Sequence, residues 1–258
     1  MGHTVDNHLT KPIRLSIAAP CFNECESIFD VVQEWHLFLQ RNDSIEQFEI
    51  IICNDGSQDQ TGQLLDQLAV QYPELHPIHF PTNQGAACAL QAAIRATKLD
   101  WVLLLDSDNQ FPITNVTRML TKIHNIHSGN ACAILGIRDK KDSFFLRMGS
   151  KLSGYICNLS HRSQIKDFNS ACKLVSGRLL RSLILEANGM NYSTEITSRL
   201  LEAGVPLIEV DIEHRPRTIG TSSMKFIKDS LHRMIFVLYI SLRQFMLKMK
   251  ILRRHNIL

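Results

Sequence analysis

The sequence has no long hydrophobic run. Its longest apolar stretch, "MIFVLYI", begins at Met234 and is too short to cross a bilayer, which takes about 20 residues. The first residues, "MGHTVDNHLTKP", lack the apolar segment of a secretory signal, and Asp6 stands where a myristoylation signal would have Ser or Thr. We therefore expect neither a membrane span nor a secretory signal.

Paired cysteines are also missing. The seven cysteines are odd in number and scattered, with no C-x-x-C pair and no His/Cys spacing typical of zinc sites. Most lie in apolar runs such as "IIIC" and "ACAIL", where cysteine packs as a small hydrophobic residue. This argues against a disulfide scaffold or a zinc module and predicts reduced thiols in a cytoplasmic protein.

Repeats, low-complexity tracts and a Pro- or Gly-rich linker are absent as well. The 258 residues are 45% hydrophobic and 21% charged, as in an ordinary globular protein. We expect one domain over residues 1–225, followed by a basic amphipathic tail over residues 226–258.

Charge is unevenly distributed along the chain. The net charge is +3, but the segment from Asp211 onward holds ten basic and three acidic residues, a charge of +7, which leaves −4 for the rest. A helix expected from Phe226 to Leu247 is apolar in its middle and basic at both ends, which indicates contact with a membrane surface. Alternatively, this helix packs on the core or on another subunit, so a homo-oligomer stays open. Nucleic acid is not an expected partner.

Short apolar runs alternate with amphipathic segments through the first half of the chain. They predict strands at residues 13–20, 48–53, 75–80, 100–106 and 131–137, and helices at residues 24–40, 59–72, 84–97 and 113–127. This alternation is typical of an α/β fold with a doubly wound, mostly parallel sheet.

A polar cluster follows each of the first four expected strands. The clusters read "PCFNE", "NDGSQDQT", "PTNQG" and "DSDNQFP". In doubly wound sheets, ligands bind in the crevice outside the carboxyl ends of the strands. The sequence therefore predicts a binding site at this edge of the sheet.

The fourth cluster is the most specific. Asp106, Asp108 and Gln110 alternate, so an extended backbone turns all three side chains to one side. Two carboxylates ~4 Å apart repel by about 4 kcal/mol at an effective dielectric of 20, and a divalent cation reverses that sign. Three oxygen ligands suit Mg²⁺ or Mn²⁺, which take further ligands from water and substrate phosphates. The alternative is a strand-end turn rich in Asp, Ser and Asn.

The second and third clusters have the same two interpretations. Asp55 could hold a nucleobase by its carboxylate while Gly56 lets the backbone approach closely, or the loop is a turn in which Ser57 or Asp59 caps the next helix. Gly85 and the alanines after it allow a helix to pack close to a ligand or a strand.

In this order and spacing, the four clusters resemble those of the inverting GT-A glycosyltransferases of family 2. The second half narrows the resemblance to the polyprenyl-phosphate sugar transferases, similar to dolichol-phosphate mannosyltransferase and the undecaprenyl-phosphate glycosyltransferases. The stretches that carry it are "IRDKKDSFFLRMGSKLS", "IKDFNSACKLVSGRLLR", "NYSTEITSRLLEAG" and "IEVDIEHRPRTIGTSS". The resemblance covers about residues 13–223.

The resemblance implies a GT-A fold, which is a Rossmann-like nucleotide-sugar-binding fold. It also implies metal-dependent, inverting transfer of a sugar from a nucleotide-diphosphate sugar to an acceptor, a polyprenyl phosphate, at the cytoplasmic face of a membrane. A polyprenyl phosphate is already ionised and needs no strong general base, whereas a hydroxyl acceptor would need a carboxylate to take its proton.

The resemblance further implies a role for each matching residue. The nucleotide-sugar would be bound by Pro20, Asn23, Glu24, Asp55, Gly85, Asp106, Arg217 and Ser222. The cation, Mg²⁺ or Mn²⁺, would be held by Asp106, Asp108 and Gln110. The acceptor phosphate would meet Arg138, Arg147 and Ser150. The catalytic set would be Asp108, Asp167, Glu195 and Arg217.

Three positions depart from the family pattern. Asn54 stands where the family often has a second aspartate, Ala171 replaces a glycine, and Ser223 replaces a lysine. Two alternatives therefore stay beside the leading hypothesis. One is a glycosyltransferase acting on a sugar or small-molecule hydroxyl, and the other is a catalytically idle nucleotide-sugar-binding module.

Overall fold

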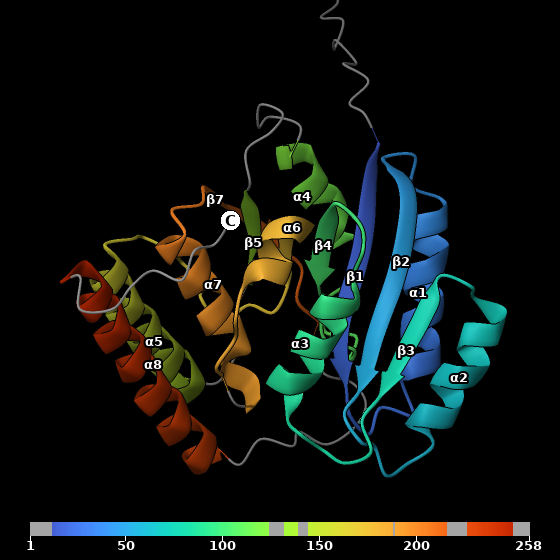
Figure 1. Ribbon diagram of the computed structural model, residues 1–258, viewed down its shortest axis with the longest axis horizontal. Helices are drawn as coiled ribbons and strands as arrows, with labels where there is room; N and C mark the ends of the chain where they lie inside the picture. Colours follow the sequence, from blue (N-terminus) through green and yellow to red (C-terminus); the bar gives the residue numbers. More distant parts are fainter. Residues whose placement is uncertain (1–11, 124–131, 139–143, 188, 216–225, 250–258) are drawn as a thin grey trace, which may run out of the picture.

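The computed structural model describes residues 12–123, 132–138, 144–187, 189–215 and 226–249, and its strands form a 7-stranded sheet (Figure 1). The strand order is β3-β2-β1-β4-β6-β5-β7. The strands are β1 (Ile13–Cys21), β2 (Ile45–Asn54), β3 (Leu75–His79), β4 (Trp101–Leu104), β5 (Ala133–Arg138), β6 (Lys173–Ser176) and β7 (Leu207–Ile212).

Helices alternate with these strands through the first half and cluster in the second. The helices are α1 (Ile28–Gln40), α2 (Thr61–Gln71), α3 (Ala86–Ala96), α4 (Asn115–Ile123), α5 (Phe144–His161), α6 (Gly177–Ser182), the 3₁₀ turn η1 (Gly189–Asn191), α7 (Tyr192–Glu202) and α8 (Phe226–Lys248). All elements expected in the first half are present within a few residues of their expected bounds, and the α/β fold class is confirmed.

The sheet is mostly parallel, as expected. β1 pairs in parallel with β2 and β4, β2 with β3, and β5 with β7. β6 is the exception, because it lies antiparallel between β4 and β5. This inserted strand brings residues near position 173 next to the carboxyl end of β4, where Leu104 pairs with Lys173.

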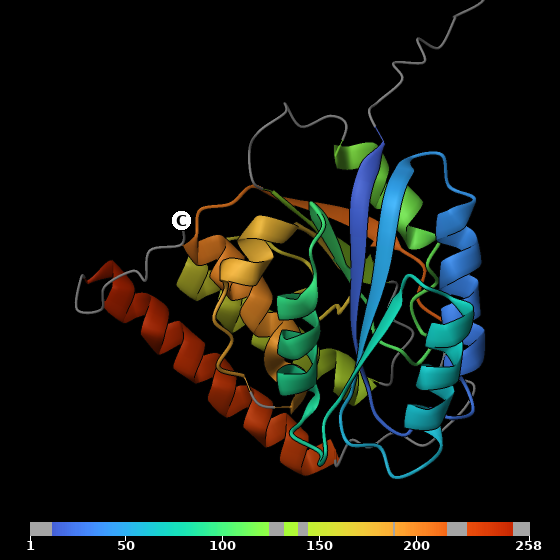
Figure 2. The same ribbon diagram turned by 45° about the vertical axis from the view of Figure 1, so that its right-hand side comes forward.

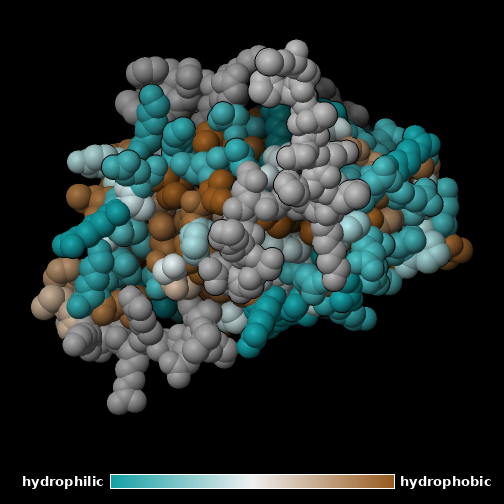
Figure 3. All heavy atoms as spheres, turned by 90° about the horizontal axis from the view of Figure 1, so that it is seen from above, coloured by the Kyte–Doolittle hydropathy of each residue, from teal (hydrophilic) through white to brown (hydrophobic). Residues whose placement is uncertain are grey.

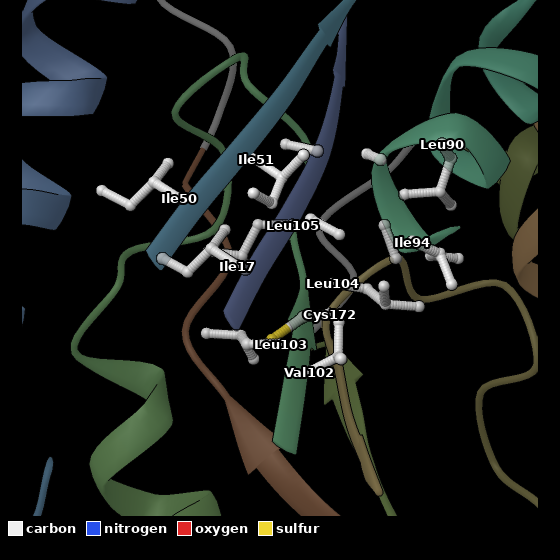
Figure 4. Close-up of a cluster of buried hydrophobic side chains, with 14 of the residues drawn as sticks. Ile17, Ile50, Ile51, Leu90, Ile94, Val102, Leu103, Leu104, Leu105 and Cys172 are labelled. Carbon is white, nitrogen blue, oxygen red and sulfur yellow. The ribbon is translucent and has the colours of Figure 1, made fainter. Parts of the chain in front are cut away.

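The central strands are covered on both faces. Ile17, Ile50 and Leu103 are fully or almost fully buried, as expected for parallel strands between two helical layers. Figure 4 shows Ile50 and Leu103 on one side of the strands and Leu104 on the other, toward α3. The helices α1 and α4 cover the face opposite α3 (Figure 1).

The expected tail helix is present as α8 and lies along α5 and α7 (Figures 1 and 2). Its Val237 is fully buried in a small apolar cluster with Cys157 and Phe168. Arg243 pairs with Glu202 of α7 at 2.5 Å. In the described part of the chain, no helix is long and apolar enough to cross a membrane.

Candidate active site

The loops after β1 and β2 are bound to each other. The backbone N–H of Asn23 donates to Ser57 Oγ at 2.9 Å, and the N–H of Gln58 donates back to Asn23 Oδ1 at 2.8 Å. Glu24 N donates to Thr61 Oγ1 at 2.9 Å. Asn23 adopts a left-handed φ of 54°, which asparagine tolerates better than most residues. The first two polar clusters therefore form one surface.

Asp55 extends this surface to the loop after β3. Its carboxylate is buried and accepts from the backbone N–H groups of Gln84 at 2.7 Å and Gly85 at 2.9 Å. Gly56 is required here, because a Cβ at its φ of 66° would lie 2.4 Å from the Thr82 carbonyl carbon. The carboxylate predicted to bind the nucleotide thus also holds the third cluster in place.

The fourth cluster joins the first through Ser107, whose Oγ donates to the carbonyl of Pro20 at 2.8 Å. Asp108 Oδ1 accepts from the N–H of Gln110 at 3.1 Å, which is the strand-end turn considered as an alternative. Arg215 donates to this turn, from its N–H to the Gln110 carbonyl at 2.8 Å and from Nη1 to Asn109 Oδ1 at 3.2 Å. The four clusters meet at one edge of the sheet, as the sequence predicts.

Two carboxylates lie at the centre of this edge. Asp106 is partly buried and accepts a hydrogen bond from the Tyr192 hydroxyl at 2.5 Å. Burial and the charge of Asp108 raise the pKa of Asp106 to about 6, against the opposing effects of Tyr192 and two cationic side chains. The ionised pair is therefore under electrostatic strain that a cation would relieve.

The oxygen atoms of Asp106, Asp108 and Gln110 are ligands of the kind that a hard divalent cation prefers. The described residues contain no group of three or more His, Cys, Asp or Glu that could hold a metal ion. An ion at Asp106 and Asp108 would therefore complete its shell with Gln110, water or phosphate oxygens. Such shared coordination is usual for Mg²⁺, which is bound by one or two carboxylates plus substrate phosphates.

A buried ion pair lies beside the carboxylates. Arg138 at the end of β5 donates to both oxygens of Asp167, from Nε at 2.9 Å and from Nη2 at 3.2 Å. The Asp167 side chain is only 2% exposed. The structure thus brings the predicted acceptor-phosphate arginine and the predicted catalytic aspartate together as partners of each other.

Lys173 is buried close to the Arg138–Asp167 pair and to Asp106. It is fully buried, and its Nζ donates to the carbonyl of Ser170 and to Ser193 Oγ. Burial lowers the pKa of Lys173 to about 7, reinforced by Arg138 and opposed by Asp167 and Asp106. The carboxylates of Asp106 and Asp108 and the Arg138–Asp167 pair therefore share one electrostatic environment.

Glu195 is placed differently. Its carboxylate is 1% exposed, accepts from the backbone N–H groups of Glu186 and Ala187, and pairs with Arg199 at 2.8 Å. These contacts fix the segment before η1 on α7. A place for Glu195 at the reaction centre stays a prediction.

Of the remaining predicted residues, the structure describes only some. Ser150 on α5 accepts from Asn169 Nδ2 at 3.0 Å, and the N–H of Asn169 donates to Asp167 at 3.1 Å, so Ser150 is connected to the ion pair. The side chain of Arg147 lies outside the described part of the chain, as do residues 217 and 222.

Two residues of this region, Lys173 and Tyr192, were not predicted from the sequence. Lys173 carries a detectable signal, because a lysine inside the apolar strand "CKLVS" predicts a buried charge that needs partners. Tyr192 carries none, because its contact with Asp106 spans 86 positions of the chain.

Comparison with known proteins decides the family. The model of "Glycosyl transferase family 2" matches residues 16–186. The chain belongs to this family. Glycosyltransferase AglD of Haloferax volcanii is 24% identical over 226 residues, which are 85% of this chain and 35% of that protein. The undecaprenyl-phosphate 4-deoxy-4-formamido-L-arabinose transferase of Photorhabdus laumondii is 27% identical over 83% of this chain and 64% of that protein.

The chain thus spans about one to two thirds of the length of these curated relatives. Among solved structures, it is similar to glucosyl-3-phosphoglycerate synthase from Mycobacterium tuberculosis in complex with Mn²⁺, UDP and glucosyl-3-phosphoglycerate. The TM-score is 0.62 at 18% identity, over 90% of this chain and 80% of that one. At this identity the likeness shows the shared fold, and the expected GT-A fold and family resemblance are confirmed.

Proposed function

We propose that this chain is a metal-dependent inverting glycosyltransferase that moves a sugar from a nucleotide-diphosphate sugar to a polyprenyl phosphate. The observation that carries the proposal is the pair Asp106 and Asp108, which lies where the loops after β1, β2 and β4 meet. The family match and the polyprenyl-phosphate relatives support it. The Mn²⁺ and UDP bound by a protein of the same fold are consistent with it.

The donor would lie across these loops, with its base and ribose at Pro20, Asn23, Glu24 and Asp55. Asp106 and Asp108, with Gln110, would hold the cation against the diphosphate. A bound Mg²⁺ or Mn²⁺ supplies positive charge that offsets the charge developing on the leaving diphosphate. Arg217 and Ser222 would reach the same phosphates.

The acceptor would approach from the side of α5. Asp167 engages two of the five N–H donors of Arg138 and fixes the plane of its guanidinium. We infer that Arg138, with Arg147 and Ser150, receives the acceptor phosphate in this fixed orientation. Because that phosphate is already ionised, Asp167 would serve to orient Arg138 and would not need to take a proton.

We also infer that residues 226–258 attach the domain of residues 1–225 to the cytoplasmic face of a membrane. Large apolar side chains are exposed along the outer face of α8, at Leu231, Ile235, Leu238, Tyr239, Leu242 and Phe245. The adjacent α5 exposes three more, at Leu152, Tyr155 and Leu159. In Figure 3, hydrophobic side chains reach the surface on the left of the molecule, the side on which Figure 1 draws these helices.

A transfer assay tests the reaction. Purified protein would be incubated with Mn²⁺, a panel of labelled UDP- and GDP-sugars, and either undecaprenyl phosphate in vesicles or soluble sugars. Label transferred to the lipid, and abolished by EDTA, is the expected result. Transfer to a soluble hydroxyl alone would replace the acceptor assignment, and tight donor binding without transfer would favour an idle binding module.

Flotation with anionic vesicles tests the surface. Leu238→Glu and Leu242→Glu place charges on the exposed face of α8, whereas Val70→Glu alters an equally apolar side chain that is 88% exposed on α2. Only the α8 variants should lose vesicle binding. Wild-type protein that ignores vesicles at low salt but dimerises through this face would replace the membrane with a second copy.

A further inference from the structure

Tyr192 donates its hydroxyl to Asp106 Oδ1 at 2.5 Å, and it is only 3% exposed. We propose that Tyr192 is a positioning residue for the metal site: it holds one oxygen of Asp106 so that the other oxygen is presented to the cation. This proposal rests on the metal-dependent function proposed above. It adds a residue from α7 to a site otherwise built by the loops that follow the first four strands.

The tyrosine is itself held in place. It is the first residue of α7, and the two residues after it are bonded to the core beside the site. Ser193 Oγ accepts from Lys173 Nζ at 2.5 Å, and Thr194 Oγ1 donates to Asn169 Oδ1 at 2.6 Å. Three successive side chains thus fix the first turn of α7 against three different groups of the site. A shift of Tyr192 would have to break the bonds of its neighbours.

The preceding backbone links this turn to the donor side. Gly85, whose N–H is bonded to Asp55, lies beside Gly189: a Cβ on Gly85 would be in ordinary van der Waals contact, 3.6 Å from Gly189 N. Gly189 begins η1, which leads directly into Tyr192. The carboxylate predicted to bind the nucleotide and the carboxylate predicted to bind the metal are therefore connected through a short chain of contacts.

A phenol suits this role chemically. It is neutral, so it orders the carboxylate without adding a positive charge that would compete with the cation. Burial, with the nearby charges of Asp106 and Asp108, raises the pKa of Tyr192 well above its ordinary value, so the hydroxyl remains a donor. Residues that hydrogen-bond to metal ligands in this way typically contribute 10–100-fold to metal affinity or activity.

Tyr192→Phe tests the proposal, because it removes only the hydroxyl. We expect the affinity for Mn²⁺ in the absence of the nucleotide-sugar to weaken ~10-fold or more. The electron paramagnetic resonance signal of the free ion measures this affinity. The metal concentration for half-maximal activity should rise by a similar factor, while the donor KM at saturating Mn²⁺ stays within about twofold. The matched control is Tyr239→Phe, which removes a hydroxyl donated to the Glu186 carboxylate, also at 2.5 Å. This control should bind Mn²⁺ like wild type.

Two further variants separate the outcomes. Because Tyr192 acts through Asp106, Tyr192→Phe should add little to the loss of Mn²⁺ binding caused by Asp106→Asn, and independent, additive losses would overturn the positioning role. If Asp108→Ala loses Mn²⁺ and Tyr192→Phe does not, the positioning role alone fails. If wild type and Asp108→Ala bind Mn²⁺ equally, the metal site fails and the proposed function with it. Melting of each metal-free variant reports whether it is folded.

Discussion

The proposed donor side of the site and its proposed metal and acceptor side are stabilised in different ways. On the donor side, side chains mostly bond to backbone: Asp55 accepts from two N–H groups, and Asn23 exchanges bonds with the neighbouring loop. On the metal and acceptor side, charged and polar side chains bond to each other, as in Tyr192 with Asp106 and Arg138 with Asp167. The first arrangement shapes a surface, and the second sets the charge of a buried cluster.

Because the charges on the metal and acceptor side are buried, this difference affects how much a substitution costs. The Asp55 carboxylate is compensated by two backbone N–H groups, which a side-chain substitution at Gln84 does not remove. A buried charge that depends on one partner becomes uncompensated when that partner is lost, at a cost of about 3–5 kcal/mol. Substitutions on the metal and acceptor side should therefore have the larger effects.

The largest effect is expected for Asp108→Ala. Removing one cation ligand should lower kcat about 10³-fold, while the melting temperature of the metal-free protein stays the same or rises, because the charge that strains Asp106 is gone. Steady-state kinetics and thermal melting measure the two quantities.

The control for Asp108→Ala is Asp100→Ala, just before the opposite end of β4, where the carboxylate is 64% exposed. It should leave kcat unchanged and change the melting temperature only by the small amount expected for losing its exposed contact with Arg14. Near-full activity of Asp108→Ala, in the presence of a chelator, would remove Asp108 from the catalytic set.

The next effect is on stability, through the Arg138–Asp167 pair. Asp167→Ala leaves a largely buried guanidinium without its carboxylate and should lower the free energy of unfolding by about 3 kcal/mol. Arg138→Met should cost a similar amount, and the double variant less than the sum of the two. Urea unfolding of the single and double variants measures this coupling.

An exposed pair provides the comparison. Arg14→Met breaks the contact between Arg14 and Asp100, 3.8 Å apart and solvent-exposed, and should cost less than about 1 kcal/mol. Equal losses for Asp167→Ala and Arg14→Met would show that the buried pair contributes no more than a surface pair.

The same contrast explains what the sequence could predict. The strands and helices of the first half could be predicted from hydrophobic periodicity, because each strand there is followed by a polar loop and then by a helix. Asp55, Asp106 and Asp108 could be found because a carboxylate at a strand end has a known position in a parallel sheet. β6 was not predictable from this alternation, since it inserts antiparallel between β4 and β5 instead of continuing the parallel order. The bond from Tyr192 to Asp106 and the bonds from the N–H groups of Glu186 and Ala187 to Glu195 arise only when α7 takes its place in the fold.

A smaller effect is expected for Asp55→Ala, on the donor side. The carboxylate organises the loop that carries Gln84 and Gly85, so its loss should raise the donor KM ~10-fold with little change in kcat. Two partly buried hydrogen bonds from backbone N–H groups to a carboxylate are lost, which should cost about 2 kcal/mol of stability. Asp66→Ala, an exposed acid on α2, is the control. An unchanged KM with a collapsed kcat would give Asp55 a role in the chemical step instead.

The smallest effect concerns the pH dependence that Lys173 confers. Its folded pKa, about 7, lies below the ordinary lysine value of 10.5, so the unfolded chain binds more protons between these values. Stability from this group is therefore full above pH 10.5 and is lost as the pH falls through about 7. Relative to Lys173→Met, wild type should gain ~1 kcal/mol of stability between pH 7 and pH 8, a shift of about 2–4 °C in melting temperature.

The control is Lys98→Met, on the partly exposed segment before β4, which should gain as much stability between pH 7 and pH 8 as wild type does. A wild-type gain no larger than that of Lys173→Met would mean that Lys173 stays protonated through this range, held by Asp167 and Asp106. The cluster beside the proposed metal site would then carry more positive charge at neutral pH, and this charge would offset part of the repulsion between Asp106 and Asp108.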